Sequence, residues 1–286
     1  MTWTGGRFGE RARCVLAPNA NFMTLDGTNT WVLREPGASA AVVIDPGPLD
    51  EPHLDAIEAA CEGAAVGAVL LTHHHVDHAE AARAFAARMG CGVRALDPAY
   101  RLGSEGLAEG DVVSVAGLEL HVVATPGHTA DSLSFVVPAE RAVLTGDTVL
   151  GRGTTVVAHP DGELGAYLES LDRLHRLAES GDLTSVWPGH GPVINNALAA
   201  LDHYIAHRRQ RLAQVEQALL TLSGAPTLAG ALRHLDFAPG SGAAVTPWAV
   251  VETVYSDVDP VLWGAAELSV RAQLAYLSGG FLSSSE

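Results

Sequence analysis

The sequence predicts an α/β domain followed by a smaller helical segment. Short apolar strands recur through the first two-thirds of the chain, and stretches with apolar residues at helical spacing lie between them. Several strands end at a Pro or Gly turn that presents a His or an Asp. Because strand ends hold side chains rigidly, this recurrence also predicts where a functional site lies.

Composition narrows the class of protein. The chain has 286 residues, 48% of them apolar, which allows one large domain or one domain with a small appendage. The net charge is −16 and all 17 basic residues are Arg, which disfavours non-specific nucleic-acid binding but leaves room for a local basic groove. The three Cys form no CxxC pattern, so no disulfide framework is expected. Without a signal-peptide segment or an apolar stretch of about 18 residues, we expect a cytoplasmic protein with no membrane partner.

The strands and the first helices follow from these patterns in order. A helix is predicted from Ala79 to Gly90, and another over 164–177, where Leu and Tyr recur every three or four residues. Six strands are predicted from apolar runs that stop at turns: residues 40–45, 66–72, 118–124, 132–137, 142–144 and 185–187.

The last third of the chain reads as helical. A long helix is predicted from Asn195 to about Leu222, with apolar residues along one side. A Gly- and Pro-rich stretch at 223–227 then breaks it. The remainder, 228–286, is predicted to form short helices and a small strand near 249–255.

Four His and one Asp lie within six residues at a predicted strand-to-helix junction, which is typical of a metal site. Neutral His and ionised Asp each present a lone pair with a fixed direction. His73 and His75 are two apart in an extended segment, so their side chains point the same way, and Asp77 continues the alternation. His78 joins them if the chain turns into the helix there. His74 then points away, and we expect it to pack or to hydrogen-bond rather than to bind metal.

Three further candidates lie at other strand ends, which predicts two metal ions rather than one. Two ions a few ångströms apart can share a hydroxide that is a nucleophile at neutral pH. The alternative is a single closed zinc site or a set of scattered core histidines. A closed structural site normally uses Cys, and no Cys lies near a candidate. The ligands divide into His73, His75 and His128 for one ion, Asp77, His78 and His190 for the other, and Asp147 as the bridge.

Two other residues have more than one interpretation. Asp45, at the end of a strand, either accepts a hydrogen bond from a ligand His or caps its own turn. His159 follows a loop after Asp147, which brings it within reach of the site, although a packing role is favoured. Packing roles are also predicted for the histidines without a surrounding motif: His53, His121, His175 and His234.

Four segments resemble the metal-binding motifs of the metallo-β-lactamase superfamily, in order and in rough spacing. The resemblance implies an αβ/βα sandwich with the metals at one edge of the two sheets. It also implies a catalytic domain over 1–200 and a C-terminal helical, winged-helix-like domain over 201–286. The segments are His73-x-His75-x-Asp77-His78, Pro126-Gly127-His128-Thr129, Thr145-Gly146-Asp147 and Pro188-Gly189-His190-Gly191.

A narrower resemblance, to the lactamase-β-2-like group, covers most of the chain. That group includes an animal mitochondrial enzyme that cuts single-stranded RNA, so the resemblance implies a phosphodiester substrate as one alternative. Fold-level similarity does not transfer a substrate. The resemblance is carried by residues 23–31, 146–155, 190–194, 204–211 and 254–274.

The sequence therefore predicts a binuclear zinc hydrolase in which a metal-bridging hydroxide attacks a carbonyl carbon or a phosphorus. Iron or manganese can replace zinc with these ligands. Asp77 is the predicted catalytic residue, which orients the nucleophile through its metal. The substrate is either single-stranded RNA, in an RNase-like phosphodiesterase, or a small acyl thioester or lactone, in a glyoxalase-II-like hydrolase. A non-enzymatic interaction module is a third alternative and predicts no open coordination position.

These alternatives predict different surroundings for the metals. An RNase predicts an Arg-lined groove that includes Arg152 and the cluster Arg208-Arg209-Arg211, although a solvated helix face is favoured for that cluster. An acyl hydrolase predicts a narrow, mostly apolar pocket roofed by the C-terminal helices. The C-terminal segment is better suited to a lid or a homodimer contact than to RNA binding, because it carries acidic residues: Glu252, Asp257, Asp259 and Glu267.

Overall fold

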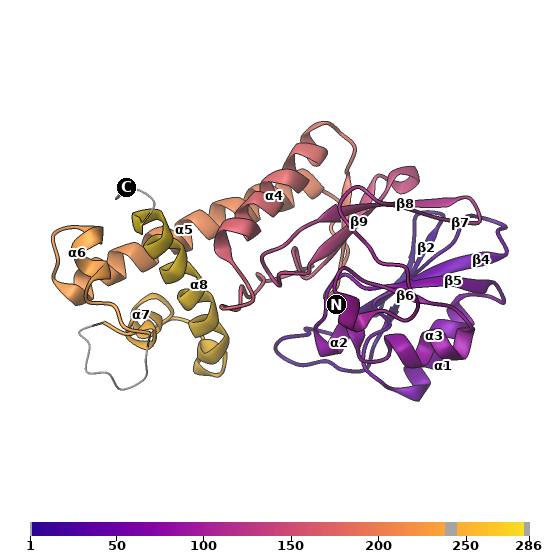
Figure 1. Ribbon diagram of the computed structural model, residues 1–286, viewed down its shortest axis with the longest axis horizontal. Coiled ribbons are helices and arrows are strands. Elements are labelled where there is room, and N and C mark those ends of the chain that lie inside the picture. The colour runs from indigo at the N-terminus through magenta and orange to yellow at the C-terminus, as the bar shows by residue number, and fades with distance from the viewer. Residues whose placement is uncertain (1, 238–244, 283–286) are drawn as a thin grey trace.

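Two β-sheets stack face to face, and helices cover the outer face of each (Figure 1). The computed structural model describes residues 2–237 and 245–282. This four-layer arrangement is the predicted αβ/βα sandwich, which is thereby confirmed. A group of C-terminal helices extends from one end of the sandwich.

The first sheet has six strands in chain order. Its first three pairs of neighbouring strands are antiparallel, and its last two pairs are parallel. Its strands are β1 (Gly6–Phe8), β2 (Ala12–Leu16), β3 (Asn29–Leu33), β4 (Ala40–Ile44), β5 (Ala65–Leu70) and β6 (Val93–Arg94). The second sheet has the order β11-β10-β9-β8-β7, with one parallel pair, β10 and β11. Its strands are β7 (Val112–Val115), β8 (Leu118–Ala124), β9 (Leu133–Val137), β10 (Ala142–Gly146) and β11 (Ser185–Pro188).

An apolar core fills the space between the sheets. Along β8, Leu118 and Leu120 are buried in this core, whereas Glu119 between them is exposed, as the two-residue period of a strand requires. Trp31 of the first sheet stacks on Trp187 of the second, with ring centroids 5.2 Å apart. These contacts fix how the strand ends of one sheet face those of the other.

Helices cover both outer faces. Helices α1 (Glu51–Ala60) and α3 (Ala82–Met89) pack on the first sheet, and α4 (Leu164–Glu179) and α5 (Ala197–Ser223) pack on the second. The predicted helix end at Gly90 is confirmed, because Gly90 adopts a left-handed backbone (φ 70°) that caps α3. In the described part of the chain, three short 3₁₀ turns also occur in the connections: Pro98–Tyr100, Pro138–Glu140 and Pro260–Leu262.

Helix α5 joins the sandwich to the C-terminal helices (Figure 1). The side chain of Asn196 caps its start by accepting a hydrogen bond from the backbone N of Ala199 (3.1 Å), and Gly224 (φ 66°) ends it. The first half of α5 packs on the second sheet, and the second half packs on the C-terminal helices. The predicted domain boundary at 200/201 therefore falls inside a continuous helix. The C-terminal helices are α6 (Leu228–Leu232), α7 (Pro247–Val254) and α8 (Trp263–Leu282).

Two local predictions are wrong. The small strand expected near 249–255 is helix α7, because Thr246 caps its start and Pro247 occupies its first turn. The helix expected from Ala79 is two helices: α2 (Val76–Ala79) begins directly after His75, and α3 begins at Ala82. Within the described residues, none of the helices is both long and apolar enough to cross a membrane. All three cysteines are free.

Candidate metal centre

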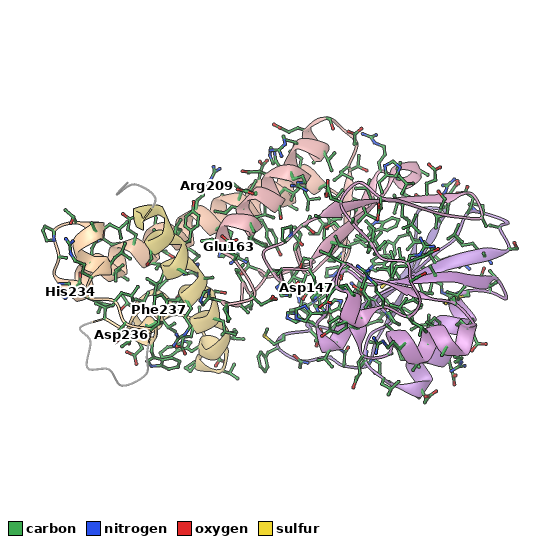
Figure 2. All side chains as sticks on the ribbon, viewed as in Figure 1. Asp147, Glu163, Arg209, His234, Asp236 and Phe237 are labelled. Carbon is green, nitrogen blue, oxygen red and sulfur yellow. The ribbon has the colours of Figure 1, made fainter. Side chains whose placement is uncertain are left out.

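The ends of strands β5, β8, β10 and β11 meet at one edge of the sandwich and carry the seven predicted ligands. Ligand-type atoms of these residues form three overlapping groups in which all atoms lie within 4.8 Å of one another. Figure 2 places Asp147 at the end of the sandwich nearest the C-terminal helices. The three groups are His73, His75 and His128; His73, His78 and Asp147; and Asp77, His78 and His190.

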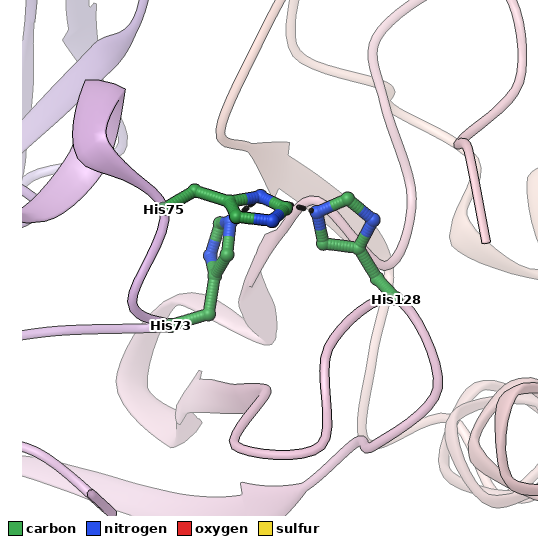
Figure 3. Close-up of side chains that lie close together, drawn as sticks. All are labelled: His73, His75 and His128. Atoms are coloured by element: carbon green, nitrogen blue, oxygen red, sulfur yellow. Dashed lines mark hydrogen bonds between the residues drawn. The ribbon is translucent and has the colours of Figure 1, made fainter. Parts of the chain in front are cut away.

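The first group converges on one point (Figure 3). Nδ1 of His75 lies 3.1 Å from Nε2 of His73 and 3.0 Å from Nε2 of His128. In a tetrahedral zinc site, ligand nitrogens about 2.0–2.1 Å from the ion lie about 3.3 Å apart. A ring nitrogen offers one proton or one lone pair, so Nδ1 of His75 cannot form two good hydrogen bonds at once. A shared cation fits this arrangement better than hydrogen bonds do.

The second group lies beside the first. Nε2 of His190 is 3.2 Å from Nε2 of His78 and 3.1 Å from Oδ2 of Asp77. Asp147 lies between the groups: its Oδ1 is 3.5 Å from Nε2 of His78, and its Oδ2 is 3.7 Å from Nε2 of His128. Oδ1 of Asp147 is buried and has no hydrogen-bond partner. A buried carboxylate oxygen without a partner is costly, and a cation between the groups would relieve that cost.

Backbone carbonyls set which ring nitrogen faces the centre. Nδ1 of His128 donates a hydrogen bond to the carbonyl O of Val156 (2.7 Å), and Nδ1 of His190 donates to the carbonyl O of Gly27 (3.1 Å). Each bond places the proton on Nδ1 and leaves the Nε2 lone pair toward the centre. Both histidines are therefore held in the tautomer that metal binding requires.

Asp45 performs the same task for His78. Its Oδ2 accepts hydrogen bonds from Nδ1 of His78 (2.9 Å) and from the hydroxyl of Thr72 (2.6 Å), and its Oδ1 accepts from the backbone N of Thr72 (2.8 Å). The prediction that Asp45 accepts a hydrogen bond from a candidate ligand His is confirmed. The side chain is 2% exposed, so these bonds are shielded from water.

Close packing around Gly189 explains why a glycine precedes the last candidate ligand, His190. A Cβ at this position would lie 2.7 Å from Oδ1 of Asp147 and 2.8 Å from Cε1 of His78. Any side chain would therefore intrude on the space where the two groups of ligands meet. The Pro-Gly turn that the sequence displays is needed for the backbone to approach this closely.

The charges of the centre also favour a cation. Burial, helped by neighbouring histidines, lowers the pKa of His75 to about 4 and holds that of His73 well below its usual range. Burial works against the charge of His190, but the Asp147 carboxylate outweighs it and raises the pKa of His190 to about 9. Burial likewise opposes ionisation of Asp147, yet His190 and His78 hold its pKa well below the usual range. In the absence of metal, protons on His78 and His190 balance the carboxylates, and bound cations would replace those protons.

Two other histidines lie outside the centre. Nδ1 of His74 is 2.8 Å from Oδ1 of Asp131, so His74 points away as predicted. The ring of His159 lies 6.5 Å from that of Phe237, among the C-terminal residues, and no ligand-type group includes it. The packing role favoured for His159 is consistent with this position.

Replacing Asp45 with Asn is expected to weaken metal binding by about 10- to 100-fold. An amide has only one acceptor oxygen, so if that oxygen accepts from the backbone N of Thr72, its NH2 group faces Nδ1 of His78 and the ring loses the acceptor that orients it. Competition with a chromophoric chelator measures this affinity. Asp131→Asn is the matched control, since Asp131 bonds to the histidine that points away. Equal affinities in the Asp45 and Asp131 variants would contradict the assigned role of Asp45.

A pocket of about 360 Å³ opens beside the centre, between the sandwich and the C-terminal helices. His128 and Asp147 form part of its wall. The predicted solvated face for the arginine cluster is wrong for Arg208, which is 4% exposed and lines this pocket, whereas Arg209 is exposed. The apolar lining comes from the β2–β3 loop, the β10–α4 loop and the C-terminal helices: Phe22, Met23, Leu25, Leu150, Val156, Val258, Leu262, Ala265 and Ala266.

The sequence reasoning missed His207 and Tyr255 as residues of this pocket. His207 directly precedes Arg208 on α5, and this adjacency was the available signal. Tyr255 lies at the end of the segment that was expected to be a strand, and only the packing of α7 brings it to the pocket.

The four-layer fold, the clustered ligands and the adjoining pocket define a metal-dependent hydrolase. Residues 23–190 match the model of the metallo-beta-lactamase superfamily, and residues 246–278 match that of the beta-lactamase associated winged helix domain. The chain belongs to the metallo-beta-lactamase superfamily.

Individual relatives cover most of the chain. It is 32% identical to a beta-lactamase-like protein 2 homolog of Caenorhabditis elegans, over 72% of this chain and 70% of that protein. It is 33% identical to an atrochrysone carboxyl ACP thioesterase of Aspergillus fumigatus, over 72% of this chain and 64% of that protein. Among solved structures, a metallo-beta-lactamase family protein from Thermus thermophilus matches with a TM-score of 0.71 and 21% identity, over 94% of this chain and 93% of that one.

Proposed function

We propose that the protein is a binuclear metal-dependent hydrolase of small acyl thioesters or esters. The pocket beside the ligand groups supports this proposal, because its volume of about 360 Å³ and its largely apolar lining suit an acyl chain. The similarity to a protein named as an acyl carrier protein thioesterase supports it further. We propose zinc as the native metal, with iron or manganese as alternatives, because the ligand atoms are nitrogen and oxygen.

The chain contributes ligands, orientation and a partly enclosed pocket. Bound divalent ions would supply Lewis acidity and a nucleophile at neutral pH. Asp77 belongs to the second group, in which its Oδ2 lies 3.1 Å from Nε2 of His190, and it would help to hold an ion there and so orient the nucleophile. The C-terminal residues Val258, Leu262 and Ala266 line the same pocket as His128 and Asp147, so an acyl chain would lie between the two domains and shield the reaction from water.

A phosphodiesterase that cuts single-stranded RNA is the second candidate function. Arg208 and Arg211 in the pocket wall favour it, because guanidinium groups bind phosphates well. The acidic net charge of −16 counts against a long RNA substrate. The acyl substrate is therefore the better supported of the two.

A hydrolysis panel with elemental analysis tests the proposal. The metal-loaded enzyme is assayed with acyl thioesters, lactones, a cephalosporin, bis-p-nitrophenyl phosphate and RNA oligonucleotides. We expect turnover of the thioesters and close to two metal ions per chain. Cleavage confined to RNA, with an affinity that falls steeply as salt rises, would instead support the phosphodiesterase.

A further inference from the structure

Helix α5 places a buried cation in the wall of the pocket. Arg208 is 4% exposed, and one of its terminal nitrogens donates a hydrogen bond to the carbonyl O of Thr155. Its guanidinium carbon lies 4.9 Å from the centre of the Tyr167 ring. The Nε–H of the same guanidinium is buried and has no hydrogen-bond partner. A donor in this state is unfavourable unless a ligand completes it.

Arg208 also lacks an ion pair. Among the residues that the structure describes, none of the carboxylates forms an ion pair with Arg208 or Arg211, whereas Arg152 at the edge of the same pocket pairs with Asp26. Arg211 lies over the Tyr255 ring, 4.7 Å from its centre. Asp147, the carboxylate in the described lining of the pocket, faces the candidate ligand histidines rather than these arginines. The two cations therefore create a local positive potential at their side of the pocket. An anionic group entering the pocket would be attracted to this wall.

His207 adds a third polar group to this wall. Its Nδ1 is buried and has no hydrogen-bond partner. Burial and the adjacent charges of Arg208 and Arg211 lower the pKa of His207 to about 4, so the ring is neutral at pH 7. The imidazole therefore offers a hydrogen-bonding nitrogen without adding charge.

The wall is close to the ligand groups. The hydroxyl of Thr155 donates to the main-chain O of Asp147, and the carbonyl of Thr155 accepts from Arg208. Thr155 thus links the guanidinium to the segment that carries Asp147. One ligand in the pocket can reach both the centre and Arg208, because both line the same cavity.

We propose that Arg208, with Arg211 and His207, forms an anion-binding subsite. Its ligand is a carboxylate or phosphate that the substrate carries in addition to the bond to be cleaved. A guanidinium binds either group through charge-assisted hydrogen bonds, and its unpaired Nε–H supplies one of them. The identity of the cleaved bond rests on the proposed function. The subsite itself rests on the contacts of Arg208.

Binding of an uncleavable anion tests the subsite without relying on hydrolysis. Calorimetry on the metal-loaded full chain compares 1-pentanesulfonate, whose sulfonate is a weak metal ligand, with neutral methyl pentyl sulfone. We expect the sulfonate to bind about tenfold or more tightly to the wild type, and Arg208→Met to remove this preference. Arg209→Met is the matched control, since Arg209 lies on the same helix but is exposed, and it should keep the preference.

Two outcomes would overturn the subsite. One is equal binding of the two probes by the wild type, a result that needs no variant. The other is an unchanged preference in Arg208→Met with a wild-type circular dichroism spectrum, which would mean that Arg208 only supports the Thr155 loop. If Arg208→Met does not fold, Arg211→Met replaces it, and an unchanged preference for the sulfonate in that variant also overturns the subsite.

Kinetics then identify the source of the anion. Succinyl and butyryl thioesters of N-acetylcysteamine differ by a carboxylate on the acyl part, whereas butyryl-phosphopantetheine and butyryl-pantetheine differ by a phosphate on the carrier part. We expect kcat/KM to favour the anionic member of one pair about tenfold, and Arg208→Met to abolish that preference. If the thioesters are hydrolysed without a preference in either pair, the anion that the subsite binds does not belong to the substrate. Absence of hydrolysis of all four overturns the proposed function, while the sulfonate experiment still decides the subsite.

Discussion

Replacing Asp147 with Asn is expected to lower kcat/KM of the metal-saturated enzyme by about three orders of magnitude. Oδ1 of Asp147 lies 3.5 Å from Nε2 of His78, and Oδ2 lies 3.5 Å from Nε2 of His190 and 3.7 Å from Nε2 of His128. Asn keeps the shape but loses the charge and one oxygen, so it cannot hold two cations at this position. The loss corresponds to about 4 kcal/mol of transition-state stabilisation.

Steady-state kinetics with a saturating metal supply and mass-spectrometric metal analysis measure this effect. Asp131→Asn serves as the control, because Asp131 also bonds to a histidine of the same segment but points away from the ligand groups. We expect the Asp147 variant to lose metal as well as activity, and the Asp131 variant to keep both. Full activity in Asp147→Asn would contradict the proposed bridging role of Asp147 and the binuclear arrangement that depends on it.

Removing bound metal with a chelator is expected to lower the free energy of unfolding by about 4 kcal/mol, relative to protein in metal at a thousand times the dissociation constant. The candidate ligands follow four strand ends of two sheets, so a bound cation would tie the edge of the sandwich together. In the apo protein the same edge holds two partly buried carboxylates, Asp77 and Asp147, which protons on His78 and His190 balance. Urea unfolding followed by circular dichroism, with and without metal, measures the difference.

His75→Ala and His74→Ala form the matched pair for this experiment. The two residues are adjacent, but only His75 belongs to a ligand group. Metal should stabilise the His74 variant as much as the wild type and the His75 variant much less. If both variants gain equally from metal, His75 is not a ligand.

Local sequence patterns were sufficient to predict the candidate ligands, because each lies a few residues after an apolar strand, in the turn or, for Asp77 and His78, in the short helix α2 that follows it. The run that ends at His73 and the Pro-Gly turn before His190 are both encoded within about ten residues. Patterns of this length were not sufficient for five strands: β1, β2, β3, β6 and β7. Strand β1 has only three residues, and an Arg interrupts β2, so neither shows an apolar run. Pairing with neighbouring strands, rather than local propensity, determines these elements.

Helix α7 shows the limit of the same reasoning. Its residues Val250, Val251 and Val254 have high strand propensity, which is why a strand was expected. The cap at Thr246 and packing against α5 and α8 outweigh that preference. Tertiary contacts override propensity here because the energetic difference per residue is small.

By itself, the sequence determined the fold class and the set of side chains gathered at the sheet edge, since strand periodicity and turn residues act over a few positions. Only the tertiary structure decided that Asp45 orients His78, that Arg208 turns into the pocket while Arg209 faces solvent, and that C-terminal residues line the same pocket. Such relations join residues far apart in the chain. They depend on which surfaces pack together, and no local pattern contains that information.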